Sequence, residues 1–156
     1  MKRLLLTALL LLASSAWAAP IDDAAAANAR GDFAAELKIT RPLATKGEAW
    51  AQSNLGGMYV NGQGVLQDYA EAVKWFKLAA AQGSEMAQYN LGVMYSKGQG
   101  VPMDDVRAHM WFNLVAVKGA GGKNRDIIAK KMTPQQMAEA QKLARECQAR
   151  NFKGCE

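Results

Sequence analysis

The sequence repeats itself with a period of 36 residues. Shifting the chain by that interval aligns residues 51–59 (AQSNLGGMY) with residues 87–95 (AQYNLGVMY), and the Gly-Gln-Gly-Val segment at 62–65 with the same four residues at 98–101. A period of this length is typical of helix pairs that stack, because one pair is too small to bury its own apolar face. We therefore predict an all-α chain of stacked antiparallel helix pairs.

Each unit carries start and stop signals for two helices. We expect Asp68 to cap one helix, with Glu71 three residues later completing a capping box. Gly83 should end that helix, because glycine tolerates the left-handed backbone of a helix end, and Ser84 should cap the next one. The short link predicts that the two helices lie antiparallel to each other.

Two glycines, Gly56 and Gly92, fall inside the predicted helices at equivalent positions of the repeat. Glycine in a helix costs about 1 kcal/mol relative to alanine. We expect that the backbone of a neighbouring helix approaches closely at both positions, where a Cβ atom would be in the way.

Residues 32–119 resemble the Sel1-like repeat, a relative of the tetratricopeptide repeat. The resemblance rests on Leu-Gly-x-Met-Tyr, then Gly-x-Gly-Val, and then Asp, Ala, Trp, paired alanines and Gln-Gly at the family's spacing. It implies an α/α solenoid, a right-handed superhelix that serves as a scaffold for protein or peptide ligands and needs no cofactor. The first copy departs from the pattern at Pro42, which aligns with Leu78, so we expect its helix to be kinked or cut short.

Residues 1–18 are typical of a cleavable signal peptide. Lys2 and Arg3 precede an apolar run at 4–13 that is too short to span a bilayer, and Ala16-Trp17-Ala18 provides the small residues that signal peptidase requires. We predict cleavage after Ala18 and a periplasmic or secreted protein without stable membrane insertion. An uncleaved anchor helix is the alternative. Residues 19–31 then form an N-terminal segment ahead of the repeats.

Residues 120–156 are predicted to form a C-terminal helical cap with a tethered tail. Thr133 and Gln136 make a capping box around Pro134, and the helix should run to about Arg150. In an exported chain, the two cysteines, Cys147 and Cys155, favour a disulfide that fastens the tail to this helix. A redox pair or a metal site are the alternatives, although the Cys-x-x-Cys spacing that activates a thiol is absent.

The charge is uneven along the chain. Residues 19–117 contain eight basic and ten acidic side chains, whereas residues 118–156 contain nine basic and four acidic ones. The basic segment predicts either a solvated helix face or a weak contact with an anionic surface. We expect no nucleic acid partner for an exported chain.

Helical periodicity also identifies candidate binding residues. With Leu55, Tyr59, Leu91 and Tyr95 in the core, one row of each first helix remains exposed and would line a concave groove. For Trp50 and Met86, packing between repeats is an equally good interpretation. The candidate groove residues are Trp50, Ser53, Gly57 and Val60, and in the next copy Met86, Tyr89, Val93 and Ser96.

No catalytic residue or metal ligand can be assigned. The chain has one histidine, His109, which falls on an apolar helix face and is predicted to be packed in the core. Nucleophile elbows, phosphate-binding loops and His-Glu-x-x-His sites are absent from the sequence. We therefore predict a non-enzymatic adaptor for a protein or peptide in the bacterial cell envelope. The alternative is a penicillin-binding or β-lactamase-like hydrolase, an activity described for relatives with a cysteine pair in every repeat.

Overall fold

The computed structural model describes residues 19–116 and 119–155, and these residues form helices and connecting turns without any β-strand. The predicted signal peptide and its cleavage point after Ala18 lie outside the described residues. Residues 19–29 are helical. The helices that follow are α2 (Phe33–Thr45), α3 (Ala49–Asn61), α4 (Tyr69–Ala80), α5 (Glu85–Lys97), α6 (Asp105–Ala116), α7 (Gly122–Ala129) and α8 (Pro134–Ala149).

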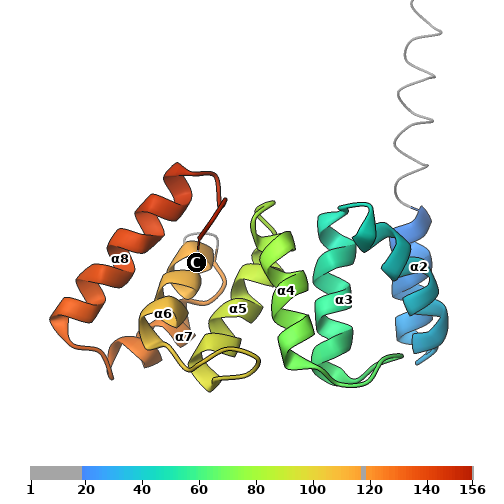
Figure 1. Ribbon diagram of the computed structural model, residues 1–156, viewed down its shortest axis with the longest axis horizontal. Coiled ribbons are helices and arrows are strands. Elements are labelled where there is room, and N and C mark those ends of the chain that lie inside the picture. Colours follow the sequence, from blue (N-terminus) through green and yellow to red (C-terminus); the bar gives the residue numbers. More distant parts are fainter. Residues whose placement is uncertain (1–18, 117–118, 156) are drawn as a thin grey trace, which may run out of the picture.

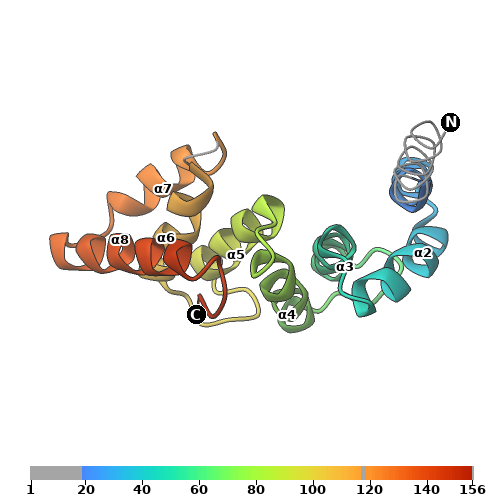
Figure 2. The same cartoon turned by 90° about the horizontal axis from the view of Figure 1, so that it is seen from above.

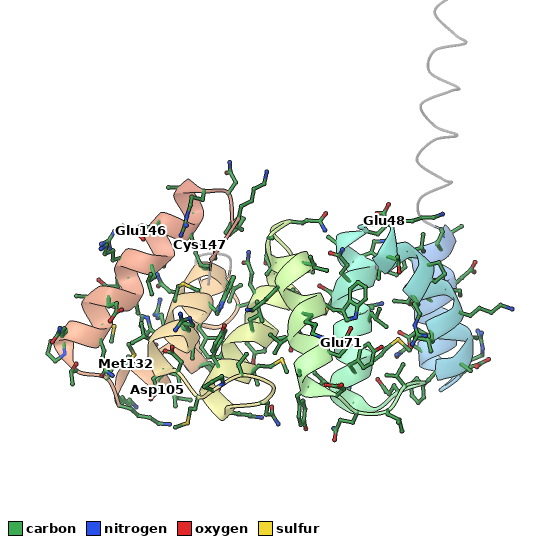
Figure 3. All side chains as sticks on the ribbon, viewed as in Figure 1. Glu48, Glu71, Asp105, Met132, Glu146 and Cys147 are labelled. Carbon is green, nitrogen blue, oxygen red and sulfur yellow. A yellow bond between two sulfur atoms is a disulfide. The ribbon has the colours of Figure 1, made fainter. Side chains whose placement is uncertain are left out.

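The helices stack in the order of the sequence (Figure 1). From α2 to α7, each helix packs against the one that follows it, and α8 packs against α6. In Figure 3, Glu48, which precedes α3, lies at the upper edge of the molecule and Glu71, in the first turn of α4, lies well below it, as antiparallel neighbours require. This arrangement confirms the all-α solenoid of stacked helix pairs.

An aspartate starts α2, α4 and α6 at intervals of 36 residues. Asp32 accepts a hydrogen bond from Ala35 N at 3.0 Å, Asp68 from Glu71 N at 2.9 Å and Asp104 from Arg107 N at 2.9 Å. The predicted cap at Asp68 is thus present, but the capping box is not. The Asp68 N–H that the box requires donates instead to the Tyr59 carbonyl at 3.0 Å, and Glu71 pairs with Lys74 at 2.7 Å on the same helix face.

A phenylalanine ring covers each of the two helical glycines. A Cβ atom placed on Gly56 would lie 2.7 Å from the Phe76 ring, and one placed on Gly92 would lie 2.7 Å from the Phe112 ring. Both rings are buried. The close approach is therefore made by a side chain of the following helix and not, as we expected, by its backbone; the ring enters the space left by the missing Cβ.

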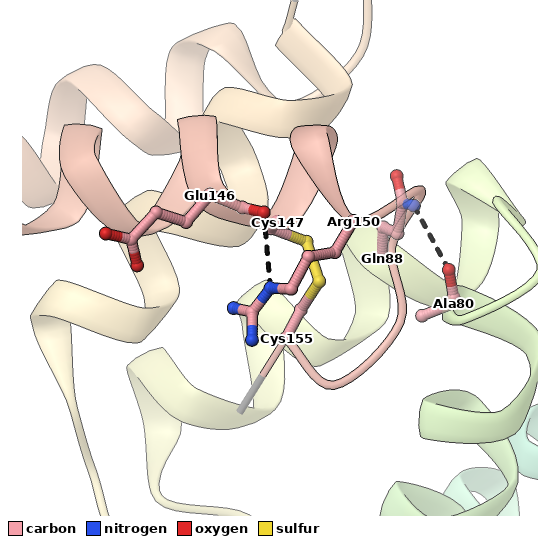
Figure 4. Close-up of a disulfide and its surroundings, with 6 residues drawn as sticks. All are labelled: Ala80, Gln88, Glu146, Cys147, Arg150 and Cys155. Atoms are coloured by element: carbon pink, nitrogen blue, oxygen red, sulfur yellow. Dashed lines mark hydrogen bonds between the residues drawn. A yellow bond between two sulfur atoms is a disulfide. The ribbon is translucent and has the colours of Figure 1, made fainter.

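Buried glutamines join the end of one helix to the next. Gln52 donates to the carbonyl of Ala44 and Gln88 to the carbonyl of Ala80, each at 3.3 Å (Figure 4). Each carbonyl also accepts from the turn that follows its helix, Ala44 from Gly47 N at 3.0 Å and Ala80 from Gly83 N at 2.9 Å, so the glutamine adds a second bond that ties the next helix to the end of this one. Gln52 and Gln88 are one period apart, and the repeat therefore preserves the bond together with the fold.

Pro42 does not cut the first helix short. Helix α2 continues past it to Thr45, and Lys46 N donates to the Pro42 carbonyl at 3.1 Å. The proline is exposed in the last turn, where water can satisfy the carbonyl that the missing N–H leaves free.

The C-terminal helix α8 begins with the capping box that the sequence predicts. Gln136 N donates to Thr133 Oγ1 at 3.2 Å, and Thr133 N donates to Gln136 Oε1 at 2.9 Å. Near the other end, Cys147 is bonded to Cys155 (Figure 4). Among the helices of residues 19–116 and 119–155, none is long and apolar enough to cross a bilayer.

Candidate functional site

One side of the stack has a projecting helix at each end. In Figure 2, α7 and the helical residues 19–29 project toward the same side, and α3 and α5 lie between them. We call this side the inner face. Two pockets open on it, and they come from different repeat units.

The larger pocket, here called the α5–α7 groove, has a volume of about 590 Å³. Its lining residues are Tyr89, Asn90, Val93, Ser96, Lys97, Phe112, Asn124, Ile127, Ile128 and Lys131. The smaller one, here called the Glu36 pocket, has a volume of about 160 Å³. Its lining residues are Asn28, Glu36, Ser53, Asn54, Gly57, Met58, Asn61, Gln63, Met86 and Asn90.

The floor of the α5–α7 groove is apolar and held in place. Tyr89 packs edge-on against Phe112 with ring centroids 5.6 Å apart, and Asn124 Nδ2 donates to the Tyr89 hydroxyl at 2.8 Å. Ile127 adds a side chain that is 53% exposed. An exposed apolar side chain above a fixed aromatic pair is a surface on which another apolar side chain can bind without rearrangement.

The rim of the α5–α7 groove carries positive charge. Lys97, at the end of α5, and Lys131, after α7, both line it. In the part of the chain that the structure describes, neither amine forms a salt bridge. The groove thus combines an apolar floor with two amines that can attract an anionic group.

Two asparagines line the pockets, and one of them is shared by both. Asn54 and Asn90 stand at the same position of the repeat, and both are half-buried. Asn54 lines the Glu36 pocket, and Asn90 lines both pockets. Neither side chain has a hydrogen-bond partner among residues 19–116 and 119–155. A primary amide can both donate and accept, which matches the N–H and C=O groups of a peptide backbone.

The structure places the predicted binding residues in three different settings. Tyr89, Val93 and Ser96 line the α5–α7 groove, and Met86 and Gly57 line the Glu36 pocket. The four residues predicted in the second copy, Met86, Tyr89, Val93 and Ser96, therefore all face the inner side.

Ser53 differs from the prediction of an exposed row. It is only 2% exposed, and its hydroxyl forms a 2.7 Å hydrogen bond with the hydroxyl of Ser84, the residue that caps α5. The serine joins α3 to the start of the next repeat, so most of its side chain is withdrawn from any ligand.

Trp50 and Val60 are half-buried and line neither pocket. Trp50 packs against Ala44, Ala51, Leu55 and Met58, and Val60 packs against the main core. For Trp50, packing between repeats and ligand binding were the two interpretations that the sequence left open, and its contacts with this cluster agree with packing.

Sequence reasoning missed much of the polar lining and the whole contribution of α7. Asn54 and Asn90 left a usable signal, because the same polar residue recurs in the middle of two otherwise small and apolar helices. No sequence signal pointed to Asn124, Ile127 and Lys131, because the third copy of the repeat lacks the motif that would place them.

His109 lies in the core and outside both pockets. It is 3% exposed, and within residues 19–116 and 119–155 its Nδ1 atom has no hydrogen-bond partner. Burial lowers the pKa of His109, and the nearby Arg125 guanidinium lowers it further. Among the same residues, no cluster of three or more His, Cys, Asp or Glu side chains could hold a metal ion.

The disulfide lies at a third pocket, of about 210 Å³, between α4, α6 and the C-terminal tail. Cys155, Phe152 and Leu78 contribute to its lining. The Phe152 ring lies close to Gly83, with its Cδ2 atom 3.6 Å from where a Cβ of that glycine would be. The tail therefore reaches back along the stack to the turn before α5.

Comparison with known proteins gives one family and several similar structures, two of which follow. Residues 51–84 and 85–116 each match the Sel1 repeat. No curated protein matches the sequence.

The first similar structure is a protective antigen present in uropathogenic Escherichia coli strains, which displays an SLR fold. It is 34% identical to this chain at a TM-score of 0.73, and the match covers 78% of this chain and 27% of the antigen. The second is a Sel1 repeat protein from Oxalobacter formigenes, 35% identical at a TM-score of 0.53, with 55% of this chain and 66% of that protein covered. The chain thus spans about a quarter of the length of the first and about two thirds of the second.

Proposed function

Because residues 51–84 and 85–116 are Sel1 repeats, this chain is a Sel1-like repeat protein, and we propose that it is a non-enzymatic adaptor that binds a peptide segment of another protein on its inner face. Sel1 repeats generally mediate protein–protein interactions. The fold supplies a rigid curved support of the kind on which such interactions are built.

The α5–α7 groove is the observation that carries this proposal. Its floor offers Ile127 and the Tyr89–Phe112 pair to an apolar side chain, and its rim offers Lys97 and Lys131 to an acidic group. An apolar anchor surrounded by convergent polar groups is the usual composition of a peptide-binding pocket. We therefore expect the bound segment to place an apolar residue and an acidic residue close together.

Export to the cell envelope is the second part of the proposal. Two observations support it. The basic and apolar segment at residues 1–18 is typical of a signal peptide. The bond between Cys147 and Cys155 is of a kind that persists in oxidising compartments and is rare in the cytoplasm.

A matched pair of variants tests the groove. Ile127 in α7 is 53% exposed and Leu78 in α4 is 50% exposed, but only Ile127 lines the inner face. Ile127→Asp should abolish capture of the partner from a solubilised envelope fraction, whereas Leu78→Asp should leave it unchanged. Both variants should retain the wild-type circular dichroism spectrum. Loss of capture with Leu78→Asp alone would place the binding surface on the opposite side and contradict the proposal.

A further inference from the structure

The Glu36 pocket contains a buried carboxylate without a cationic partner. Glu36 is 3% exposed, and its Oε2 atom accepts one hydrogen bond, from Asn28 Nδ2 at 2.8 Å. Across residues 19–116 and 119–155, no lysine or arginine forms a salt bridge with it. A buried carboxylate is costly unless it is paired, because the charged form loses its hydration. One neutral amide is a small compensation for that loss.

Several amide side chains line the pocket beside this carboxylate, and their oxygens can accept hydrogen bonds. Asn61 donates through its Nδ2 atom to Gln63 Oε1 at 3.2 Å, which leaves its own carbonyl oxygen to accept. Asn54, which also lines the pocket, has an amide oxygen that can accept as well. An ammonium group carries three N–H donors and a guanidinium group carries five, with no acceptor in either. The lining therefore complements an organic cation in both charge and hydrogen bonding.

We propose that the Glu36 pocket is the subsite for a lysine or arginine side chain of the peptide bound on the inner face. This inference rests on the proposed function and adds the charge that the ligand must carry. The Met86 side chain is exposed at the same pocket and can cover the aliphatic stem of such a residue.

The two pockets together give the ligand a direction. Asn90 lines both, and the carboxylate of Glu36 and the amines of Lys97 and Lys131 lie in different pockets. A peptide that follows the inner face therefore places its basic residue against α2 and α3 and its acidic residue against α5 and α7. Reversing the peptide would set like charges against each other at both ends, which penalises binding.

A divalent metal ion fits the Glu36 pocket less well than an organic cation. Calcium takes six to eight oxygen ligands, usually with several carboxylates among them. In the described part of the chain, Glu36 belongs to no cluster of three candidate metal ligands.

The first experiment uses the wild-type protein and a small probe. We would titrate the ¹⁵N-labelled protein with n-butylamine hydrochloride, which imitates a lysine side chain, and follow the amide signals of Gly57 and Asn54 by NMR. We expect a saturable shift of these signals, and no saturable shift with butyramide, which has a similar shape and no charge. Equal shifts with both compounds, no saturable shift with n-butylamine, or the same response to calcium chloride would each overturn the inference.

The second experiment uses Glu36→Gln, which keeps the size of the side chain and removes its charge. Because a charge buried without a cation is removed, the free variant should have a higher melting temperature than the wild type. The same change should weaken n-butylamine binding by about tenfold or more, since the cation loses its partner. The control is Glu139→Gln on the exposed surface of α8, which should change neither property. Unchanged n-butylamine binding by folded Glu36→Gln would overturn the inference.

The two proposals fail separately. If Ile127→Asp abolishes partner capture while n-butylamine does not bind, the adaptor function stands and the cation subsite is wrong. If n-butylamine binds at Glu36 while Ile127→Asp leaves partner capture unchanged, the cation site exists but is not part of the proposed peptide groove. The inference in its present form is then overturned.

Discussion

The adjacent glycines of α3 should respond differently to the same substitution. A Cβ atom on Gly56 would lie 2.7 Å from both Cδ1 and Cε1 of Phe76, whereas a Cβ on Gly57 would have no neighbour within 4 Å. Carbon atoms in contact normally lie about 3.5 to 4.0 Å apart. The Phe76 ring would therefore have to move by roughly 1 Å in Gly56→Ala, although it is fully buried.

The expected magnitudes follow from two opposing effects. Replacing a helical glycine by alanine stabilises the folded state by about 1 kcal/mol, and this gain applies to both positions. Overpacking a buried site costs about 1 to 3 kcal/mol, and this cost applies to Gly56 alone. Gly57→Ala should therefore raise the free energy of unfolding by about 1 kcal/mol. The free energy of unfolding of Gly56→Ala should be lower than that of Gly57→Ala by about 1 to 3 kcal/mol. Gly56→Ala should therefore be neutral or destabilising relative to wild type.

Urea unfolding of the two variants and the wild type, with the disulfide intact, measures this difference. The slope against urea concentration should be the same for all three, so that the midpoints report stability. In a Phe76→Leu background the smaller side chain should reduce the difference between the two alanine variants. Equal stabilisation by Gly56→Ala and Gly57→Ala would refute the idea that Phe76 requires the glycine.

Three further predictions concern the core and the tail. Because burial lowers the pKa of His109, its contribution to stability is present above the ordinary pKa of histidine and is lost as the pH falls through the lowered value. The free energy of unfolding should thus decline from pH 7 to pH 5 more steeply in the wild type than in His109→Gln, and parallel curves would contradict this. Reducing the disulfide between Cys147 and Cys155, which closes a loop with a sequence separation of 8, should lower the free energy of unfolding by about 2 to 3 kcal/mol, measured by urea unfolding with and without reductant. Gln88→Ala should cost about 0.5 to 1.5 kcal/mol because the Ala80 carbonyl loses its buried hydrogen bond to the glutamine and keeps only the one from Gly83 N, whereas Gln63→Ala, which ends no such buried bond, should cost less than about 0.5 kcal/mol. Similar losses for the two glutamine variants would show that the buried bond contributes nothing.

The architecture could be predicted because the sequence repeats its structural signals. Asp68, Gly83 and Thr133 each mark a helix end through local chemistry, and the period of 36 residues assigns the same role to the copies of Asp68 and Gly83. The capping box at Asp68 is absent because the Asp68 N–H already donates to the Tyr59 carbonyl of α3. A backbone acceptor in the preceding helix is a competitor that a four-residue motif does not reveal.

The candidate site could be predicted only in part. A helical period tells which residues share a face, but it does not tell which neighbouring helix covers that face. Ser53 was therefore assigned to the surface, although the cap of α5 lies against it. The Glu36 pocket combines residues 19–29, α2, α3 and α5, and α2 belongs to a copy that diverges from the repeat. No spacing rule brings these elements together, so the buried carboxylate emerges from the three-dimensional arrangement.

The inner face as a peptide-binding surface can be tested most directly by locating a bound peptide. A peptide selected from a random library on the immobilised protein would be titrated into ¹⁵N-labelled protein, and the shifts of backbone and asparagine side-chain amides would be mapped onto the helices. We predict that the largest shifts fall on α3, α5 and α7, with the Asn54 and Asn90 side chains among them, and that Ile127→Asp abolishes them. Shifts concentrated around Leu78 and Phe152, with Asn54 and Asn90 unaffected, would contradict the assignment of binding to the inner face.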